Sequence, residues 1–384
     1  MNTRARTKEK NIKVAYVAHS DLFSSRANVG QKLKMCEAFS DTGFDVELVV
    51  PRVKKSKNIL FDSYDIDTKF PIRNIFSQSS SIYYQLPGNF FKRFERRIFL
   101  RKAASFLNAR QDTIVYTRDK RSGDYFSRFV LEVHNLSNSL APAENETFRK
   151  ALLIVCISHG LSDRLINFGV PESKIIVAAD GVDLSKFTPE LTRADARARV
   201  DLPKDKPIVL YAGHLYPWKG ADLLCELAER MPDTLFIIVG GKAADVNRLR
   251  ETYMPRNNLL LLGHQPAKAI PRFLFAADVL VIPNRGELDV SRYFTSPLKL
   301  FEYMAAGRPI VASDLPSMRE VLTEESAAFF EAGNIKDLES VVKGLLQNHD
   351  WARGMASTAR KVVTHYTWRN RAERIGEEIM KKLT

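Results

Sequence analysis

The segment from Ser296 to Gly307 contains the residue types and spacing that most clearly suggest a binding site. Ser296 is a common helix-capping residue, Pro297 suits the first helical position, and Gly307 suits the residue after the last turn. A helix that begins here directs unpaired backbone N–H groups, and roughly half a positive charge, at whatever lies before it. The segment therefore predicts an anion site at the start of a helix.

Two charged side chains on this predicted helix, Lys299 and Glu302, lie within one turn of each other. An apolar stripe runs beside them and consists of Leu298, Phe301 and Ala305. Glu302 would then contact a ligand lying along the first turns, and a phosphate at the helix tip with a sugar or ribose beside it fits this pattern. The alternative is an ordinary surface ion pair between Lys299 and Glu302, and a short motif alone does not separate the two.

A second candidate anion site lies at 213–220, between a predicted strand and a predicted helix. Gly213 allows a ligand to approach the backbone closely, and Lys219 supplies a point charge suited to phosphate. Taken alone, a lysine before a helix is usually a solvated charge. Because this element and the helix after Ser296 both follow strand ends of one predicted sheet, together they favour a site for a diphosphate.

Strand and helix patterns alternate along the chain around these two elements. The predicted strands are 12–17, 46–50, 113–116, 129–133, 154–157, 175–177, 208–212, 235–239, 259–262, 279–282 and 310–313, and the predicted helices include 31–40, 221–231, 267–276 and 297–306. This alternation indicates parallel sheets covered by helices, and it repeats on both sides of the polar stretch 183–207. We therefore predict an α/β fold of two Rossmann-like domains, 1–182 and 183–366, that face each other across a cleft. Ligands of such sheets bind at the carboxyl ends of the strands, which places the predicted site in that cleft.

The composition limits the class of protein. A chain of 384 residues with 45% hydrophobic content is long enough to form two full cores. The three cysteines, Cys36, Cys156 and Cys225, are far apart and lack metal-ligand spacing, so we expect a reducing compartment and no metal site. We find neither a membrane-spanning apolar run of about 20 residues nor a secretory signal, and we expect a cytoplasmic protein.

The net charge of +13 calls for an anionic partner. Nucleotides, nucleic acid and anionic lipid all satisfy this requirement, so the charge does not choose between them. The Gly240-Gly241 pair follows a predicted strand but lacks the spacing of the dinucleotide fingerprint, and a hydride-transfer cofactor is therefore not expected.

Taken together, the motifs resemble those of the retaining GT-B fold glycosyltransferases of the family-4 type, also called glycosyl transferases group 1. The resemblance is carried by 156–158, by 181–183 with Phe187, by 211–220 and by 296–320. It implies that 183–366 binds a nucleoside-diphosphate sugar, with UDP or GDP as the nucleotide, and that 1–182 binds the acceptor. The helix after Trp368, at 367–384, would pack back onto the first domain. Neither a cofactor nor a required metal is implied.

The resemblance assigns roles to the residues of both candidate sites. Lys219 would grip the donor diphosphate, with Gly213 and His214 beside it, and Glu302 would bind the nucleotide ribose. The start of the helix would hold the distal phosphate, through Ser296, Pro297, Leu298 and Lys299. Stabilising the charge that develops on the departing nucleoside diphosphate would then be the main catalytic contribution of these groups, as no nucleophile set is evident.

The sequence departs from the family pattern at two positions. Many members have a glutamate eight residues before Glu302 that contacts the donor sugar, and this chain has Phe294 there. Many also have an arginine where this chain has His214, so a titratable ring replaces a permanent charge. A GT-B-like protein that binds nucleotide sugar without transferring it therefore remains an alternative.

In the first domain, the resemblance points to residues at predicted strand ends. His134, in the segment Glu132-Val133-His134-Asn135, would approach the transferred sugar, although a single histidine is as often structural. Arg118 ends another predicted strand, and Arg26 and Gly30 lie in the loop before the first helix. We expect these three residues near the acceptor or the phosphate.

The segment 89–110 is strongly basic and rich in aromatic residues. A basic helix with aromatics on another face indicates binding to an anionic membrane surface; its candidate residues are Lys92, Arg93, Arg96, Arg97 and Arg101. The acceptor would then be a lipid-linked or polysaccharide or glycolipid precursor at the cytoplasmic face of the membrane. One alternative is a domain helix with a solvated basic face. Nucleic acid is a further alternative that no recognisable motif supports.

Overall fold

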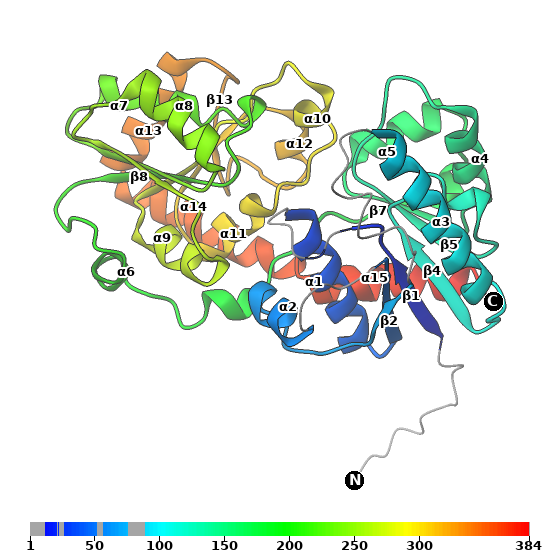
Figure 1. The fold of residues 1–384 in the computed structure, drawn as a ribbon. Coiled ribbons are helices and arrows are strands. Elements are labelled where there is room, and N and C mark those ends of the chain that lie inside the picture. Colours follow the sequence, from blue (N-terminus) through cyan, green and yellow to red (C-terminus); the bar gives the residue numbers. More distant parts are fainter. Residues whose placement is uncertain (1–11, 21, 23–26, 52–56, 76–88, 384) are drawn as a thin grey trace, which may run out of the picture. The chain divides into compact units, whose positions relative to one another are not determined.

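The computed structural model describes residues 12–20, 22, 27–51, 57–75 and 89–383. The chain divides into two compact units (Figure 1). The first consists of Met1–Ile157, Leu161–Ala178 and Trp368–Thr384, and the second of Ser158–Gly160 and Ala179–Thr367.

The first unit is built on a parallel sheet of seven strands in the order β3-β2-β1-β4-β5-β6-β7. The strands are β1 (Lys13–Val17), β2 (Asp45–Val50), β3 (Ile72–Asn74), β4 (Thr113–Thr117), β5 (Phe129–Val133), β6 (Leu153–Cys156) and β7 (Ile175–Val177). The helices are α1 (Ala27–Asp41), α2 (Lys57–Tyr64), α3 (Asn89–Leu107), α4 (Pro142–Lys150), α5 (His159–Asn167) and α15 (Trp368–Lys381). The chain order reverses between β1 and β4, so their carboxyl ends form the topological switch point at which such sheets bind ligands.

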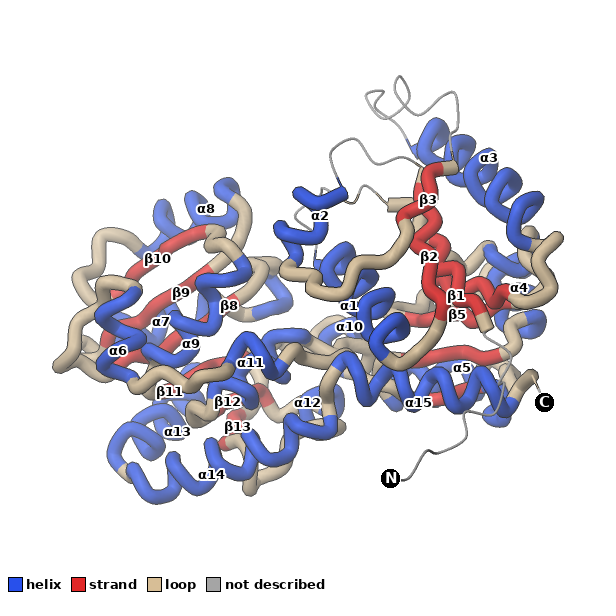
Figure 2. Tube along the Cα trace, turned by 90° about the horizontal axis from the view of Figure 1, so that it is seen from below, coloured by secondary structure: helices blue, strands red, loops and turns tan. Residues whose placement is uncertain are grey.

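Helix α15 is part of the first unit although it comes last in the chain (Figure 2). It packs against α1 along its length. At Gly376 the approach is so close that an added Cβ would lie 2.7 Å from the ring of Phe44, so glycine permits the contact.

The second unit is built on a parallel sheet of six strands in the order β10-β9-β8-β11-β12-β13. The strands are β8 (Ile208–Ala212), β9 (Leu235–Val239), β10 (Leu259–Gly263), β11 (Val279–Ile282), β12 (Ile310–Ser313) and β13 (Ala328–Phe330). The helices are α6 (Arg193–Arg199), α7 (Asp222–Arg230), α8 (Ala243–Tyr253), α9 (Ile270–Ala276), α10 (Asp289–Arg292), α11 (Leu298–Ala306), α12 (Pro316–Arg319), α13 (Ile335–Gln347) and α14 (His349–Val362). Here the switch point lies between β8 and β11.

Both faces of this second sheet are buried, which explains why its strands are continuous apolar runs rather than alternating patterns. Ile208 and Leu210 of β8 belong to the core under α9 and α11, and Val209 and Tyr211 belong to the core under α7 and α13. Successive side chains of one strand thus supply opposite cores.

The predicted α/β fold with two parallel sheets is confirmed. The predicted helix over 267–276 is instead a 3₁₀ turn at Ala267–Ala269 followed by α9, in which Pro271 occupies the first turn. Strands β3 and β13 were not predicted; each has only three residues and lies at an edge of its sheet. Among the described residues, no helix combines the length and the apolarity needed to span a membrane.

Candidate functional site

In the second unit, the loop after β8 carries the first predicted anion element. Gly213 has a φ of 149°, a conformation that favours glycine, and its N–H donates to the carbonyl of Val239 at 2.9 Å. The loop then forms a 3₁₀ turn at Pro217–Lys219 and ends at Gly220, which has a φ of 67°. An added Cβ at Gly220 would lie 1.8 Å from the carbonyl oxygen of Pro283. Only glycine therefore lets this loop pack against the segment after β11.

Lys219, at the end of this turn, is a half-buried cation. Its Nζ lies 4.2 Å from the ring centroid of Trp218. Burial lowers the pKa of Lys219 to about 8. The protein thus stabilises the charged form of Lys219 only weakly. A bound anion would offset the cost of desolvating that charge.

Lys299, on the first turn of α11, is a second cation in the same region. Lys299 is buried, with 7% of its surface exposed, and its Nζ lies 4.0 Å from the ring centroid of Tyr211. Within the described part of the chain, this Nζ has no hydrogen-bond partner. Burial and then the charge of Lys219 lower the pKa of Lys299 well below its ordinary value. The two lysines therefore lie close enough to repel each other, as the cations of an anion site do before the anion binds.

The N-terminus of α11 differs from the prediction. Pro297, in an extended conformation, is the capping residue, and the helix begins at Leu298. The prediction of Ser296 as the cap is wrong, because its Oγ instead accepts a hydrogen bond from the N–H of Asp180 at 3.0 Å. Pro297 has no N–H, so the amides that the helix leaves unpaired are those of Leu298 and Lys299. Gly307 ends the helix in the left-handed conformation, as predicted.

Tyr303, which the sequence analysis did not single out, joins the two anion elements. Its hydroxyl accepts a hydrogen bond from the N–H of Ala212, the last residue of β8, at 2.6 Å. The side chain is fully buried. This bond fixes α11 relative to the strand end that leads into Gly213 and Lys219.

Glu302 is half-buried one turn along α11. Burial raises its pKa, and the charge of Lys186 acts in the opposite direction. The ion pairs between described residues do not include one from Glu302 to Lys299, and Lys299 is buried. The alternative of a surface ion pair between Lys299 and Glu302 is therefore wrong.

His214 and Phe294 show what the two departures from the family pattern mean. The His214 ring is half-buried and stacks on Tyr216, with centroids 5.3 Å apart. Burial, followed by the charges of Lys219 and Lys242, lowers the pKa of His214, so the ring is neutral at pH 7. Phe294 is buried, with 3% of its surface exposed. Neither residue supplies a charge.

Asn284, two residues after β11, is a further polar group that the sequence analysis missed. The side chain is fully buried, and neither its Oδ1 nor its Nδ2 has a hydrogen-bond partner among the described residues. It follows Pro283, which contacts Gly220. The sequence signal that could have identified Asn284 is its position just beyond the end of a predicted strand at the switch point.

In the first unit, Glu132 brings two of the predicted residues together. The Glu132 carboxylate lies 2.6 Å from Nη2 of Arg118, interacts with Nε2 of His134 and lies 3.4 Å from Nη1 of Arg371. Burial alone would raise the pKa of Glu132, but the charges of Arg118 and Arg371 outweigh it and hold the pKa well below its usual range. Arg118 also donates to Gln31 at 3.0 Å. His134 is thereby oriented by a permanent carboxylate.

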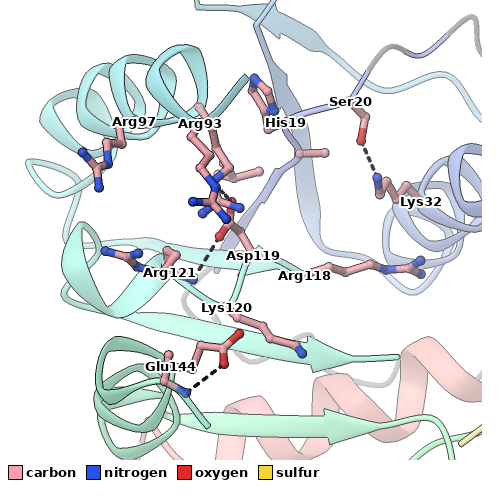
Figure 3. Close-up of a pocket in the computed structure, with 14 residues that line it drawn as sticks. His19, Ser20, Lys32, Arg93, Arg97, Arg118, Asp119, Lys120, Arg121 and Glu144 are labelled. Carbon is pink, nitrogen blue, oxygen red and sulfur yellow. Dashed lines mark hydrogen bonds and ion pairs between the residues drawn. The ribbon is translucent and has the colours of Figure 1, made fainter. Parts of the chain in front are cut away.

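The basic residues of α3 do not form one surface. Arg93, Arg96 and Arg97 line a cavity of the first unit together with Arg118 (Figure 3). Arg101 is exposed and does not line it, whereas Phe99, like Leu100, is buried in the core.

The remaining predicted residues lie elsewhere. Gly30 belongs to α1 and lies beside Tyr64 rather than at the cavity. Arg26 and the side chain of Lys92 lie outside the described residues.

Residues 192–362, most of the second unit, match the family model for glycosyl transferases group 1. This segment is a group 1 glycosyltransferase domain. It contains Lys219, Lys299 and Glu302, so the two cations and the carboxylate lie within the part of the chain that defines the family.

Among curated proteins, the chain is 27% identical over 214 residues to a D-inositol 3-phosphate glycosyltransferase of Xylanimonas cellulosilytica, covering 52% of this chain and 50% of that protein. It is 29% identical over 192 residues to the UDP-Gal:alpha-D-GlcNAc-diphosphoundecaprenol alpha-1,3-galactosyltransferase of Escherichia coli, covering 47% and 46%. The matches to these relatives thus span about half of their length.

Solved structures resemble the chain over almost its full length. A glycosyltransferase from Rickettsia africae superposes with a TM-score of 0.75 at 15% identity, covering 98% of this chain and all of the other. Anabaena HepE in complex with UDP and glucose superposes with a TM-score of 0.73 at 16% identity, covering 96% and 99%. The glycosyltransferase domain and the first unit together therefore have the GT-B fold.

Proposed function

We propose that this chain is a retaining glycosyltransferase that moves a sugar from a nucleoside-diphosphate sugar to an acceptor. The observation that carries the proposal is the pair of lysines, Lys219 and Lys299, at the switch point of the second sheet. Both cations are desolvated, and Nζ of Lys299 lacks a hydrogen-bond acceptor among the described residues. A diphosphate supplies the missing negative charge.

The donor would lie along the first turns of α11. The amides of Leu298 and Lys299, together with the two ammonium groups, would hold the diphosphate, and Glu302 would accept hydrogen bonds from the ribose hydroxyls. UDP or GDP is supported as the nucleotide: the Anabaena structure holds UDP, and the name of a mannosyltransferase from Mycolicibacterium smegmatis, 26% identical over 260 residues, specifies GDP-mannose.

Stabilisation of the negative charge on the leaving diphosphate would accelerate the reaction. When the glycosidic bond to phosphate breaks, negative charge grows on the leaving diphosphate, where Lys219, Lys299 and the helix amides are already positioned. Losing one such preorganised donor raises a reaction barrier by about 3–4 kcal/mol. His134, held by Glu132, would approach the transferred sugar from the first domain. Retention would require the acceptor to attack the same face of the sugar that the phosphate leaves.

The acceptor in this proposal is a lipid-linked, polysaccharide or glycolipid precursor, used at the cytoplasmic face of a membrane. The names of two relatives, the diphosphoundecaprenol galactosyltransferase and a phosphatidylinositol monomannoside mannosyltransferase, support an acceptor of this class. The basic helix α3 supports contact with an anionic partner.

A thermal-shift screen with UDP, GDP, ADP and their common sugars tests the donor site. One nucleotide class at about 100 times its dissociation constant should stabilise the fold by about 2.7 kcal/mol. Lys219→Ala and Glu302→Ala should lose the shift, whereas the exposed controls Lys336→Ala and Glu251→Ala should keep it. A screen without any shift would rule out the donor site.

The buried Phe294, where many family members have a glutamate, favours a second candidate: binding of the nucleotide sugar without transfer. Release of free sugar from the stabilising donor in the absence of acceptor would support the transferase. A donor that binds through Lys219 but is never cleaved, with or without acceptor, would support the binding protein instead.

A further inference from the structure

A cavity lies at the switch point of the first sheet, and neither of the two proposed donor cations lines it. It has a volume of 620 Å³, which is in the range of small-molecule sites. Its walls come from the residues after β1, the residues after β4, the first turns of α3, the start of α4, and Lys32 of α1 (Figure 3). The cavity therefore lies at the edge where a sheet of this strand order binds ligands. Its position alone, without regard to the charge of its lining, makes it a candidate ligand site.

The lining of this cavity is strongly cationic. Seven lysine and arginine side chains face it, against the two carboxylates of Asp119 and Glu144. Asp119 lies 3.6 Å from Arg96, and Glu144 accepts a hydrogen bond from the N–H of Ala141 at 3.2 Å. The lining itself thus has an excess of five positive charges, and two of its cations, Arg118 and Arg121, are paired with carboxylates outside it, Glu132 and Asp124.

Among the described residues, three of the cations form no ion pair, although the Glu144 carboxylate acts on Lys120 from a longer distance. No ion pair between described residues involves Arg93, Arg97 or Lys120, although Arg118 pairs with Glu132 and Arg121 pairs with Asp124. Burial lowers the pKa of Lys120. The unpaired charges come from two elements, α3 and the segment after β4, and converge on one space.

We propose that this cavity binds the phosphate or diphosphate group of the acceptor. The inference rests on the proposed transferase function and names the acceptor class. Guanidinium groups bind phosphate oxygens in pairs, and several of them around one cavity match a group that carries two or more negative charges. A neutral sugar would leave this excess charge unbalanced. The donor diphosphate is assigned separately, to Lys219 and Lys299 of the second unit.

The placement also changes the interpretation of α3. Arg93, Arg96 and Arg97 line the cavity, whereas Arg101 and Lys102 are exposed on the same helix and do not. The first group would recognise a ligand headgroup rather than a flat membrane surface. The phosphate could belong to a water-soluble sugar phosphate or to a lipid-linked diphosphate, and both present the same chemistry to the cavity.

The test measures binding of inorganic pyrophosphate by calorimetry to the full chain, with UDP present at saturation so that the donor site is filled. The variant Arg93→Gln/Arg97→Gln removes two cations without an ion partner, and Arg101→Gln/Lys102→Gln is the matched control on the same helix. We expect the cavity variant to weaken pyrophosphate binding about tenfold or more and the control to leave it unchanged. UDP binding should be the same in both variants.

The outcomes separate this proposal from the donor proposal. If UDP binds but pyrophosphate does not, or if both variants weaken pyrophosphate equally, the acceptor cavity is wrong and the donor site stands. If neither UDP nor GDP binds while pyrophosphate binds through Arg93 and Arg97, the donor site is wrong and the cavity stands.

Two further ligands identify the source of the phosphate. Binding of glucose 1-phosphate, but not glucose, in a manner that requires Arg93 and Arg97 would indicate a soluble sugar phosphate. Binding restricted to phosphatidylcholine vesicles that carry undecaprenyl diphosphate would indicate a lipid diphosphate. Binding to phosphatidylglycerol vesicles that depends on Arg101 and Lys102 but not on Arg93 and Arg97, with no pyrophosphate binding, would overturn the cavity in favour of a membrane surface.

Discussion

The ammonium nitrogen of Lys299 lies 4.0 Å from the ring centroid of Tyr211. The aromatic face partly compensates a buried cation, and the Tyr211 hydroxyl in turn donates to the carbonyl of His214 at 2.5 Å. One tyrosine of β8 thus contacts the cation of α11 and the loop that leads to Lys219. The charge of Lys299 is thus positioned by residues of the core.

Replacing Lys299 should therefore separate binding from stability. Lys299→Met removes a buried cation that has no hydrogen-bond partner in the described part of the chain and fills the same space, so we expect an unchanged or higher melting temperature. Binding of the nucleotide found in the screen should weaken about tenfold or more, because a charge-assisted contact is lost. Calorimetry and thermal unfolding measure the two effects, with Lys336→Met as the exposed control. Loss of stability with full affinity would contradict the assignment.

Donor binding should depend on pH through Lys219, whose pKa is about 8 in the free protein. An anion binds the protonated form and raises its pKa. Below pH 8 the proton is already present, and above pH 8 binding must take it up, so affinity should fall as the pH rises. Calorimetry in buffers of different ionisation enthalpy measures this proton uptake, which Lys219→Met should reduce. Affinity that stays constant from about pH 7 to about pH 9.5 would argue against the role of Lys219.

Tyr303→Phe should affect both the fold and the donor site. It leaves the buried N–H of Ala212 without its acceptor, which costs about 1–3 kcal/mol in the free energy of unfolding. Because the bond positions α11, nucleotide affinity should fall as well. Tyr253→Phe, which removes a long hydrogen bond to Glu226 at 3.4 Å near the surface, is the control. If urea unfolding showed that both substitutions lower the free energy of unfolding equally, the hydrogen bond of Tyr303 would contribute no more than the surface bond of Tyr253.

Two glycine-to-alanine substitutions should act in opposite directions. Gly220→Ala places a methyl group against the carbonyl of Pro283 in a left-handed conformation, and we expect a loss of about 2 kcal/mol or more. Gly354, in the middle of α14, has open space around it, so Gly354→Ala should stabilise by up to about 1 kcal/mol. The melting temperatures of the two variants test both expectations. A neutral Gly220→Ala would show that the loop can move away from β11.

Arg371→Met should destabilise the first unit by about 3–5 kcal/mol, because it leaves the buried Glu132 with less positive charge. The pKa of Glu132 is depressed in the folded state, so its stabilising contribution is present above its unfolded value of about 4.3 and is lost as the pH falls below it. Urea unfolding at pH 7 measures the effect. Adding Glu132→Gln to Arg371→Met should recover part of the stability, and no recovery would mean that charge compensation is not the cause.

The features of the fold that depend on local sequence pattern could be predicted. The boundaries of β5, β7, β8, β9, β11 and β12 agree with the prediction to the residue, because each is a mainly apolar run between polar segments. Lys219 was identified from its place between a strand and a helix, and its role stays a prediction. The side chain of Lys299 could not be placed in the interior, since lysine is normally exposed. The contacts of Tyr303 with Ala212 and of Arg371 with Glu132 join residues 91 and 239 positions apart, and nothing in a single sequence indicates such pairs.

The position of α15 in the first unit has a consequence for how the chain is made. The strands of that unit leave the ribosome early, but Arg371 follows only after residues 179–367 have been translated. Until then the Glu132 carboxylate has Arg118 but lacks its second guanidinium partner, and the face of α1 that packs against α15 is uncovered. Maturation of the first unit is therefore timed by synthesis of the second, so the nascent protein cannot complete the first unit before residues 179–367 have been made.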